Sequence, residues 1–167
     1  RLFILGTMNT ADKSVSLLDV ALRRRFKFVE CPPLPDAFTR IDTWRQRIFG
    51  IEMGTLLELI NERLLGQGVG RDRLVGHSIL AVAETESEAV IFDRFRYDLV
   101  PLLEEYLFGD PQRMQAVLPG LIDERGSLMS SALNEGYLRQ FVAPDPEAPD
   151  GPGPVTDNQE DPETVSG

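Results

Sequence analysis

The apolar positions at the start of the chain follow the pattern of a strand, a helix and a second strand. Leu2–Leu5 is a continuous apolar run, which is typical of a strand buried on both faces of a parallel sheet. In residues 14–22 the apolar positions recur at helical spacing. Residues 26–28 alternate between apolar and polar, as in a short strand. This order predicts part of an α/β core.

From residue 32 onward the pattern is helical. The prolines of Cys31–Pro35 stop any helix and favour extended backbone, so this segment is predicted to be a stiff linker. Helices are predicted over residues 36–49 and 55–65, from a capping box at Thr85, over 102–108, from Asp110–Pro111, and over 134–142. Pro101 is expected to break or restart the helix that opens at Thr85, because proline lacks the N–H and clashes with the preceding turn.

The helix predicted over residues 55–65 has the densest apolar pattern. Thr55–Glu58 matches a capping box, and Gly66 is expected to end the helix. Leu57 and Ile60 belong to a stripe of apolar side chains at helical spacing. Such a stripe predicts a buried core face, and it implies no cofactor site.

Charge divides the chain into a balanced body and an acidic tail. The net charge is −10, but residues 143–167 hold seven acids and no base, which leaves 20 acids against 17 bases, or −3, for residues 1–142. Six prolines and three glycines in the tail leave little to bury, so we expect disorder there. The predicted divisions are residues 1–31, the end of an α/β core; 32–142, an all-helical domain; and 143–167, the disordered tail.

Two features bear on location. No apolar run approaches the roughly 20 residues of a membrane span. The single cysteine, Cys31, cannot form a disulfide within the chain, so we expect a reducing, cytoplasmic location and treat Cys31 as a small filler residue.

The chain begins at Arg1, within an apolar run and without an initiator Met, and we therefore expect it to be a fragment.

Two polar clusters near the start are candidates for chemistry. Asn9 follows the predicted strand, at the sheet edge where open α/β folds bind ligands, and its carboxamide can hold a water against a phosphate. Asp12 lies three residues further on, and the same pattern also suits a plain turn that caps the next helix. Arg23–Arg25 suit an arginine presented at a subunit boundary, with a solvated helix end as the alternative.

Two later stretches are less specific. Gly66–Gly70 is rich in glycine, but it lacks the Gly-Lys-Ser/Thr ending, and lysine occurs only at positions 13 and 27. The P-loop pattern is therefore missing from these 167 residues, and the glycines suit a flexible turn. His77 is the only histidine, and a lone histidine is usually a structural residue.

The sequence GTMNTADKS followed by LLDVALRRRF resembles the AAA+ NTPases, and among them the McrB-type GTPase subunit of modification-dependent restriction systems. Residues 6–28 match the family pattern closely, except for Lys13, where the family usually has arginine. Val75–Ser78 and Pro101–Asp110 resemble the helical lid of that family. The resemblance spans roughly residues 1–118, and its four segments occur in the family's order.

The resemblance implies a fold and a set of roles. The fold is α/β: the end of an AAA+ P-loop core, with one parallel strand, a helix and a short strand, followed by an all-helical lid. Asn9 would be the first sensor, which polarises the attacking water with Asp12 nearby. Asp19, Arg24 and Arg25 would lie at the boundary with the next subunit, where one arginine acts in trans.

The lid is implied to bind nucleotide through Gly76, His77 and Ser78 as a second sensor. A typical second sensor is an arginine, so Arg71 and Arg73 compete for this role.

The implied activity is hydrolysis of GTP or ATP with Mg²⁺, which the P-loop bearing part of the longer protein would chiefly bind. McrB-type resemblance favours GTP, and ATP is the default among AAA+ proteins. The implied assembly is a homo-oligomeric ring, a hexamer, with an McrC-like endonuclease subunit and with DNA contacted through other parts of the complex. The fragment by itself is predicted to be inactive. There are two alternatives. One is a degenerate AAA+ protein that binds partners without hydrolysis, and the other is a helical adaptor whose arginines bind nucleic acid. The balanced charge of the body argues against the adaptor.

Overall fold

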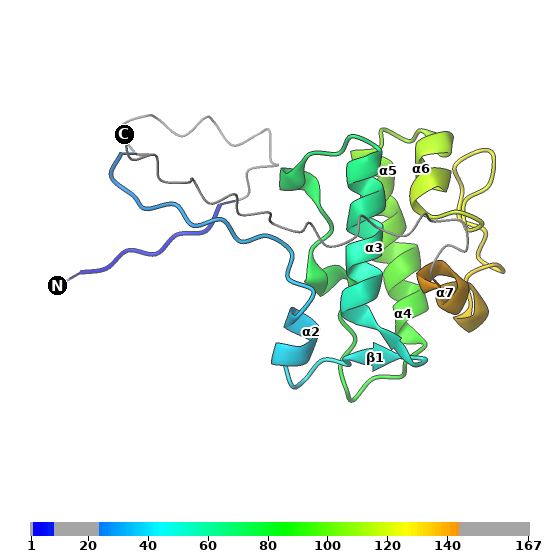
Figure 1. The fold of residues 1–167 in the computed structure, drawn as a ribbon, viewed down its shortest axis with the longest axis horizontal. Coiled ribbons are helices and arrows are strands. Elements are labelled where there is room, and N and C mark those ends of the chain that lie inside the picture. Colours follow the sequence, from blue (N-terminus) through cyan, green and yellow to red (C-terminus); the bar gives the residue numbers. More distant parts are fainter. Residues whose placement is uncertain (1, 9–23, 144–167) are drawn as a thin grey trace, which may run out of the picture.

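The computed structural model describes residues 2–8 and 24–143. Residues 36–143 form a helical body, and the described residues before them extend away from it (Figure 1). The elements are α2 (Ala37–Arg40), β1 (Arg47–Ile48), β2 (Ile51–Glu52), α3 (Met53–Gly66), η1 (Arg71–Arg73), η2 (His77–Leu80), α4 (Val90–Asp93), η3 (Arg94–Leu99), α5 (Val100–Tyr106), α6 (Pro111–Val117) and α7 (Glu135–Val142). The short turns η1 and η2 are 3₁₀ helices, and η3 is a π-helix.

Helix α3 is the centre of the body. It contacts α2, β2, η2, α6 and α7, and it buries an apolar stripe that includes Leu57 and Ile60, both 0% exposed. The prediction of a core helix here is confirmed. The predicted capping box is wrong, because the helix begins at Met53 directly after β2, and no side chain caps its first turn. At the other end the chain leaves the helix through Gly68, whose φ of +76° suits a residue without Cβ.

The prediction of a helix over residues 36–49 is wrong. Only α2 is helical, and the chain then forms the antiparallel hairpin β1–β2, whose two-residue turn has φ of +51° at Phe49 and +78° at Gly50. Tertiary contacts stabilise this turn: the ring of Phe49 stacks on Phe92 with centroids 5.4 Å apart, and its N–H donates to the carboxylate of Glu88 at 3.1 Å. These contacts outweigh the helical spacing of the local sequence.

Pro101 does not break its helix. Helices α4 and α5 are joined through η3 into one rod, and the N–H of Val100 donates to the carbonyl of Phe95, five residues earlier. A π-helical turn is wider than an α-helical one, so the proline ring is accommodated at the start of α5 without a break. Buried side chains of this rod, among them Phe95, Leu99 and Leu103, join α3 in a single apolar core.

Two predictions from local signals are confirmed. Helix α6 begins at Pro111, and the carboxylate of Asp110 accepts from the N–H groups of Gln112 at 2.9 Å and Arg113 at 3.2 Å. Helix α7 begins after Asn134, whose side-chain oxygen accepts from the N–H of Tyr137 at 3.0 Å. Each cap satisfies backbone donors that the helix itself leaves unpaired.

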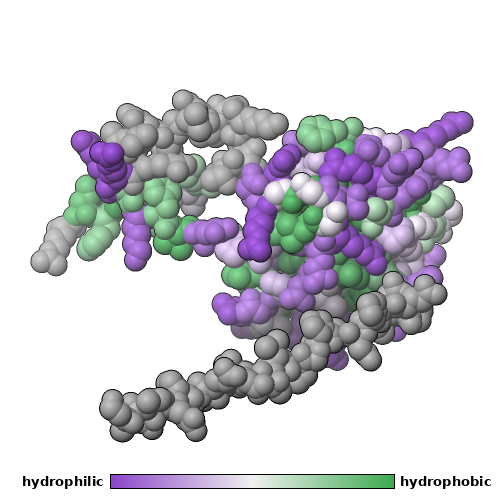
Figure 2. Space-filling model, turned by 45° about the horizontal axis from the view of Figure 1, so that its top comes forward, coloured by the Kyte–Doolittle hydropathy of each residue, from purple (hydrophilic) through white to green (hydrophobic). Residues whose placement is uncertain are grey.

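The predicted α/β core is not shown by the described residues. Leu2–Leu5 do not form a strand, and their side chains are 70% to 97% exposed; Phe26 and Phe28 are about half exposed and likewise lie outside any strand. A buried strand needs neighbouring strands, and the hairpin β1–β2 is the only sheet in the described part of the chain. Figure 2 shows apolar side chains along this extension. The predicted helix over 14–22 and residues 144–167 of the tail predicted over 143–167 lie outside the described residues.

Cys31 is exposed, so its predicted role as a filler residue is wrong. It lies in the extended segment ahead of α2, where no apolar neighbours enclose it. No helix in the described part of the chain is long and apolar enough to cross a membrane.

Candidate functional site at the junction of linker and lid

The predicted Gly76–Ser78 segment lies between α3 and the α4–α5 rod, where η2 begins. Asn61 of α3 fixes the residue before it through two hydrogen bonds. The amide Nδ2 donates to the carbonyl of Val75 at 3.0 Å, and Oδ1 accepts from the N–H of Val75 at 2.8 Å. Asn61 is 8% exposed and is the buried polar residue of the described chain. The start of η2 is therefore fixed to the central helix.

Arg94 fixes the other end of the same segment. It lies at the start of the π-helical turn η3, and its Nε donates to the carbonyl of Ala81 at 3.2 Å, directly after η2. Its Nη1 is 3.1 Å from a carboxylate oxygen of Asp98, one turn further along the helix. This ion pair is about 38% exposed at the arginine, so it orients the guanidinium more than it stabilises the fold.

His77 joins the helical body to the linker. Its Nδ1 accepts from the N–H of Leu34 at 3.4 Å, and its ring centroid is 5.9 Å from that of Trp44. Because Nδ1 accepts this bond, the neutral ring carries its proton on Nε2, which is then a hydrogen-bond donor. Ser78 is exposed and adds a hydroxyl. Donors of this kind suit phosphate oxygens, so the segment is chemically compatible with a nucleotide.

The competing arginines lie on the same stretch of chain. In Figure 1 the segment between α3 and α4 runs along the side of the body from which the linker arrives, and η1 carries Arg71 and Arg73 there. Arg71 is exposed. Arg73 acts on Tyr106 of α5: burial raises the pKa of the Tyr106 phenol, Glu105 adds to the effect, and the positive charge of Arg73 opposes it. The two arginines therefore differ in surroundings.

The other predicted site residues are not brought to this segment by the described structure. Asn9, Asp12 and Asp19 lie outside the described residues. Arg24 and Arg25 lie in an exposed turn of the extension, and no hydrogen bond or ion pair within residues 2–8 and 24–143 joins them to Gly76–Ser78. In the same part of the chain, no group of three His, Cys, Asp or Glu side chains could hold a metal ion.

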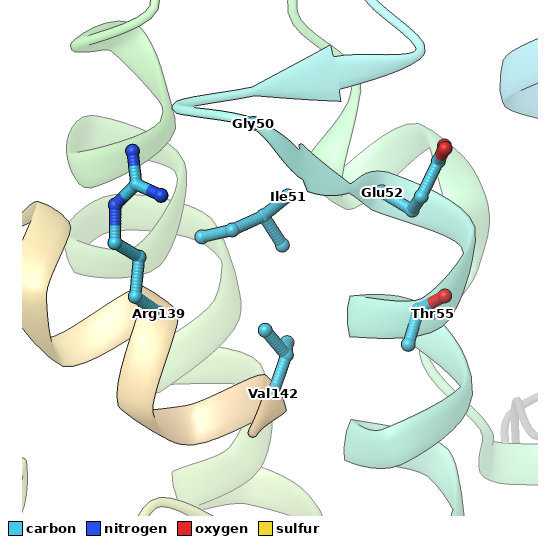
Figure 3. Close-up of a pocket in the computed structure, with 6 residues that line it drawn as sticks. All are labelled: Gly50, Ile51, Glu52, Thr55, Arg139 and Val142. Atoms are coloured by element: carbon cyan, nitrogen blue, oxygen red, sulfur yellow. The ribbon is translucent and has the colours of Figure 1, made fainter. Parts of the chain in front are cut away.

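Two depressions of the surface lie at α7, and neither is lined by a predicted site residue. One is lined by Gly50, Ile51, Glu52, Thr55, Arg139 and Val142 (Figure 3). Both charged residues of its lining are in ion pairs, Arg139 with Glu135 and Glu52 with Arg47, so neither charge is left to bind a ligand. The other is lined by residues of α3, α7 and the loops before α7, including Arg63 and Tyr137.

Two functional candidates escaped the sequence reasoning, Asn61 and Arg94. Asn61 carried a usable signal, because it interrupts the buried stripe of α3 one residue after Ile60, where a further apolar residue would continue the stripe. Arg94 gave no such signal, since its partner carbonyl is defined only by the folded loop.

Comparison with known proteins identifies the helical body. Residues 52–115 match the family described as McrB, alpha-helical lid domain. The chain is of the McrB type. The McrB-type lid therefore includes α3, the Gly76–Ser78 segment, the π-helical turn and most of α6, and it contains both Asn61 and Arg94.

A curated relative supports the same assignment. The chain is 30% identical over 131 residues to the Type IV methyl-directed restriction enzyme EcoKMcrB subunit of Escherichia coli (strain K12). The alignment covers 68% of this McrB-type chain and 27% of the relative, so the chain spans about a quarter of that protein's length. No solved structure matches the chain significantly.

Proposed function

We propose that this chain is the end of the α/β core and the lid of an AAA+ nucleoside triphosphatase, the motor subunit of a McrBC-like DNA restriction system. The observation that carries the proposal is the McrB-type lid in which His77 lies at the contact with the linker. The relative named as a restriction enzyme subunit supports the biological context. A lid attached through a short linker can rotate over a nucleotide and present donor groups to it.

In this proposal the extended N-terminal segment completes a core with other strands. That explains why the side chains of Leu2–Leu5 lie exposed in the described structure. Asn9 orients the attacking water with Asp12 beside it. Arg24 or Arg25, with Asp19 nearby, faces the nucleotide of the next subunit in a ring, where a guanidinium neutralises charge that develops on the transferred phosphoryl group. A hexamer and an McrC-like partner complete the assembly.

The nucleotide is GTP or ATP with Mg²⁺. The relationship to McrB favours GTP. His77 and Ser78 supply donors that fit phosphate oxygens, whereas the described residues contain no cluster suited to Mg²⁺, so we assign the metal to no residue of the described chain. Because the P-loop pattern is missing from these residues, we expect the 167-residue chain to show no turnover by itself.

The test uses the natural protein that carries this chain, with GTP and ATP assayed side by side. Asn9→Ala is expected to retain nucleotide binding and to lose most of kcat, because an interaction made only in the transition state does not contribute to ground-state affinity. Asn134→Ala is the control: it removes an amide that caps α7 and should leave turnover unchanged. If the wild-type protein hydrolyses neither nucleotide, the proposed enzyme activity is wrong, and the protein is instead a degenerate AAA+ protein that binds partners without hydrolysis. If Asn9→Ala loses affinity for the nucleotide but keeps its kcat, Asn9 only caps a turn and does not orient the water.

A further inference from the structure

The stretch from Val75 to Ala81 is held at both ends by side chains from different helices. Asn61 of α3 makes both available backbone hydrogen bonds of Val75, and Arg94 of η3 binds the carbonyl of Ala81. Between these anchors the backbone closes two short turns, from the N–H of Ile79 to the carbonyl of Gly76 at 3.1 Å and from the N–H of Ala81 to the carbonyl of Ser78 at 3.3 Å. The stretch is therefore fixed to the lid.

Core packing by itself gives no reason for Asn61. Its neighbours on the stripe are apolar and fully buried, and asparagine is a weaker helix former than leucine. Burying an amide is also unfavourable unless its hydrogen bonds are satisfied, and here both are satisfied by one backbone residue. The amide is thus specific for the position of Val75, two residues before His77.

Arg94 depends on the irregular geometry of its helix. It occupies the first residue of a π-helical turn, and such turns recur at functional sites. Helix η3 contacts η2 directly, so the turn and the His77 segment share one interface. The two anchors come from α3 and from the α4–α5 rod, and a displacement of either helix would be transmitted to the segment.

We propose that Asn61 and Arg94 are positioning residues that make the stretch from Val75 to Ala81 a rigid part of the lid. When the lid rotates about the linker, His77 and Ser78 then move with it as one unit and meet the nucleotide phosphates in a fixed geometry. This proposal rests on the proposed function for its catalytic consequence. The rigidity itself does not depend on it.

The first experiment measures rigidity in the natural protein by amide hydrogen exchange. Asn61→Leu and Arg94→Met are compared with the control Gln115→Met. This control also removes hydrogen bonds from a side chain to loop carbonyls, because Gln115 Nε2 donates to the carbonyls of Ile122 at 3.4 Å and Asp123 at 2.9 Å. We expect the amides of Ile79 and Ala81 to exchange at least about tenfold faster in the first two variants only, since local opening sets exchange. Unchanged exchange there, or a uniform increase over α5 and α6, overturns the proposal.

Asn61→Leu and Arg94→Met are used together because they differ in how strongly they should disturb the fold. Asn61→Leu leaves the buried N–H and carbonyl of Val75 unpaired and can unfold the lid, whereas Arg94 is partly exposed and its loss is milder. If Asn61→Leu does not fold, the result for Arg94→Met decides between the two outcomes.

The second experiment measures the coupling to His77 by a double-mutant cycle on GTP and ATP turnover. Arg94→Met is expected to lower kcat/KM at least about fivefold in the wild-type background and to have little further effect in a His77→Ala background, because residues that act as a unit are non-additive. Gln115→Met should have the same small effect in both backgrounds. Equal effects of Arg94→Met in both backgrounds overturn its positioning role.

The two failures can be told apart. If His77→Ala has wild-type turnover while hydrogen exchange responds as expected, the segment is rigid but has no part in catalysis, and the proposed function of Gly76–Ser78 fails. If His77→Ala is impaired while exchange at Ile79 and Ala81 does not respond, the segment is functional and Asn61 and Arg94 do not position it.

Discussion

The backbone N–H of Leu34 donates to Nδ1 of His77 at 3.4 Å, across 43 positions of sequence. Leu34 belongs to the proline-rich linker, and His77 opens the segment that α3 and the α4–α5 rod hold in place. In the proposed AAA+ lid, the contact therefore joins the lid, through His77, to the linker about which the lid would rotate. It also brings His77 beside Trp44, the single tryptophan of the chain.

Trp44 should report on this contact. Its ring is half buried between His77 and Phe38, with centroids 5.9 Å and 6.0 Å away. In the 167-residue chain, His77→Ala should expose the indole to water and shift its emission to longer wavelength. Ser78→Ala, at the exposed neighbouring position, is the matched control and should leave the emission unchanged. An unchanged spectrum of the His77 variant would show that the imidazole does not cover Trp44.

The core face of α3 gives a stability prediction. Leu57 and Ile60 are 0% exposed, so Leu57→Ala or Ile60→Ala should lower the free energy of unfolding by about 2–5 kcal/mol, through lost burial and the cavity that remains. Leu65→Ala is the control on the same helix, where the side chain is 41% exposed and the loss should be well under half as large. Urea unfolding followed by circular dichroism measures all three. Equal losses at the three positions would mean that the helix does not pack by this face.

Local sequence predicted the elements whose signals agree with the tertiary structure. The leucine stripe of α3, the Asp110–Pro111 start of α6 and the Asn134 cap of α7 all act within a few residues, and the fold uses them directly. The same reasoning failed at residues 41–49. There the backbone is fixed by distant partners: Arg45 donates its N–H to the carbonyl of Val82, and its guanidinium binds the carbonyls of Glu84 and Glu86.

The candidate site was only half predictable for the same reason. His77 and its neighbours were predicted because Val75–Ser78 resembles the lid of a known family, and the lid match over residues 52–115 supports the part of the fold that holds them. Asn61 and Arg94 were missed because their ligands are backbone groups of a loop, and a backbone group has no signature in sequence. Asn9, Asp12 and Asp19 stay predictions, since they lie outside the described residues.

Tyr137 carries a hydroxyl that the fold does not use. The oxygen is buried and has no hydrogen-bond partner in the described part of the chain, so it loses its hydration without compensation. Tyr137→Phe should therefore be neutral or stabilise the protein by up to about 1 kcal/mol at pH 7, as thermal unfolding would show. A loss of more than about 1 kcal/mol would indicate a partner for the hydroxyl.

The same residue predicts how stability depends on alkaline pH. Burial raises the pKa of Tyr137 above its ordinary value of 10.0, and the charge of Arg63 opposes this only in part. Because the folded state disfavours the phenolate, stability is retained below about pH 10 and falls as the pH rises beyond it. In Tyr137→Phe the free energy of unfolding should fall less steeply above pH 10. Tyr97→Phe, where the side chain is 68% exposed, controls for the loss of one phenol. Identical slopes in the wild type and Tyr137→Phe would contradict the burial of this ring.

Arg24 and Arg25 allow a test that distinguishes an arginine acting in trans from a structural one. Both are exposed in the described extension, so their loss should not disturb the lid. They belong to the segment that we propose to lie at the subunit boundary. In the natural protein, Arg24→Ala or Arg25→Ala should lower NTP turnover by ~10³–10⁵-fold at the position that serves as the finger, since guanidinium fingers contribute this much to phosphoryl transfer. Size-exclusion chromatography should show that rings still form.

Mixing two inactive variants then decides the question. One carries the arginine substitution, and the other cannot bind nucleotide at its own P-loop. In a mixed ring some interfaces pair an intact nucleotide site with an intact arginine from the neighbour, so activity should partly return, whereas each variant by itself stays inactive. Arg113→Ala is the control: its guanidinium binds the carbonyl of Gln67 within the lid at 2.6 Å, and any loss of activity it causes should not be restored by mixing. We expect the effect at Arg25 rather than Arg24, by its place in the matched motif. If mixed rings form and no activity returns, the arginine acts within its own subunit, and the trans arrangement is wrong.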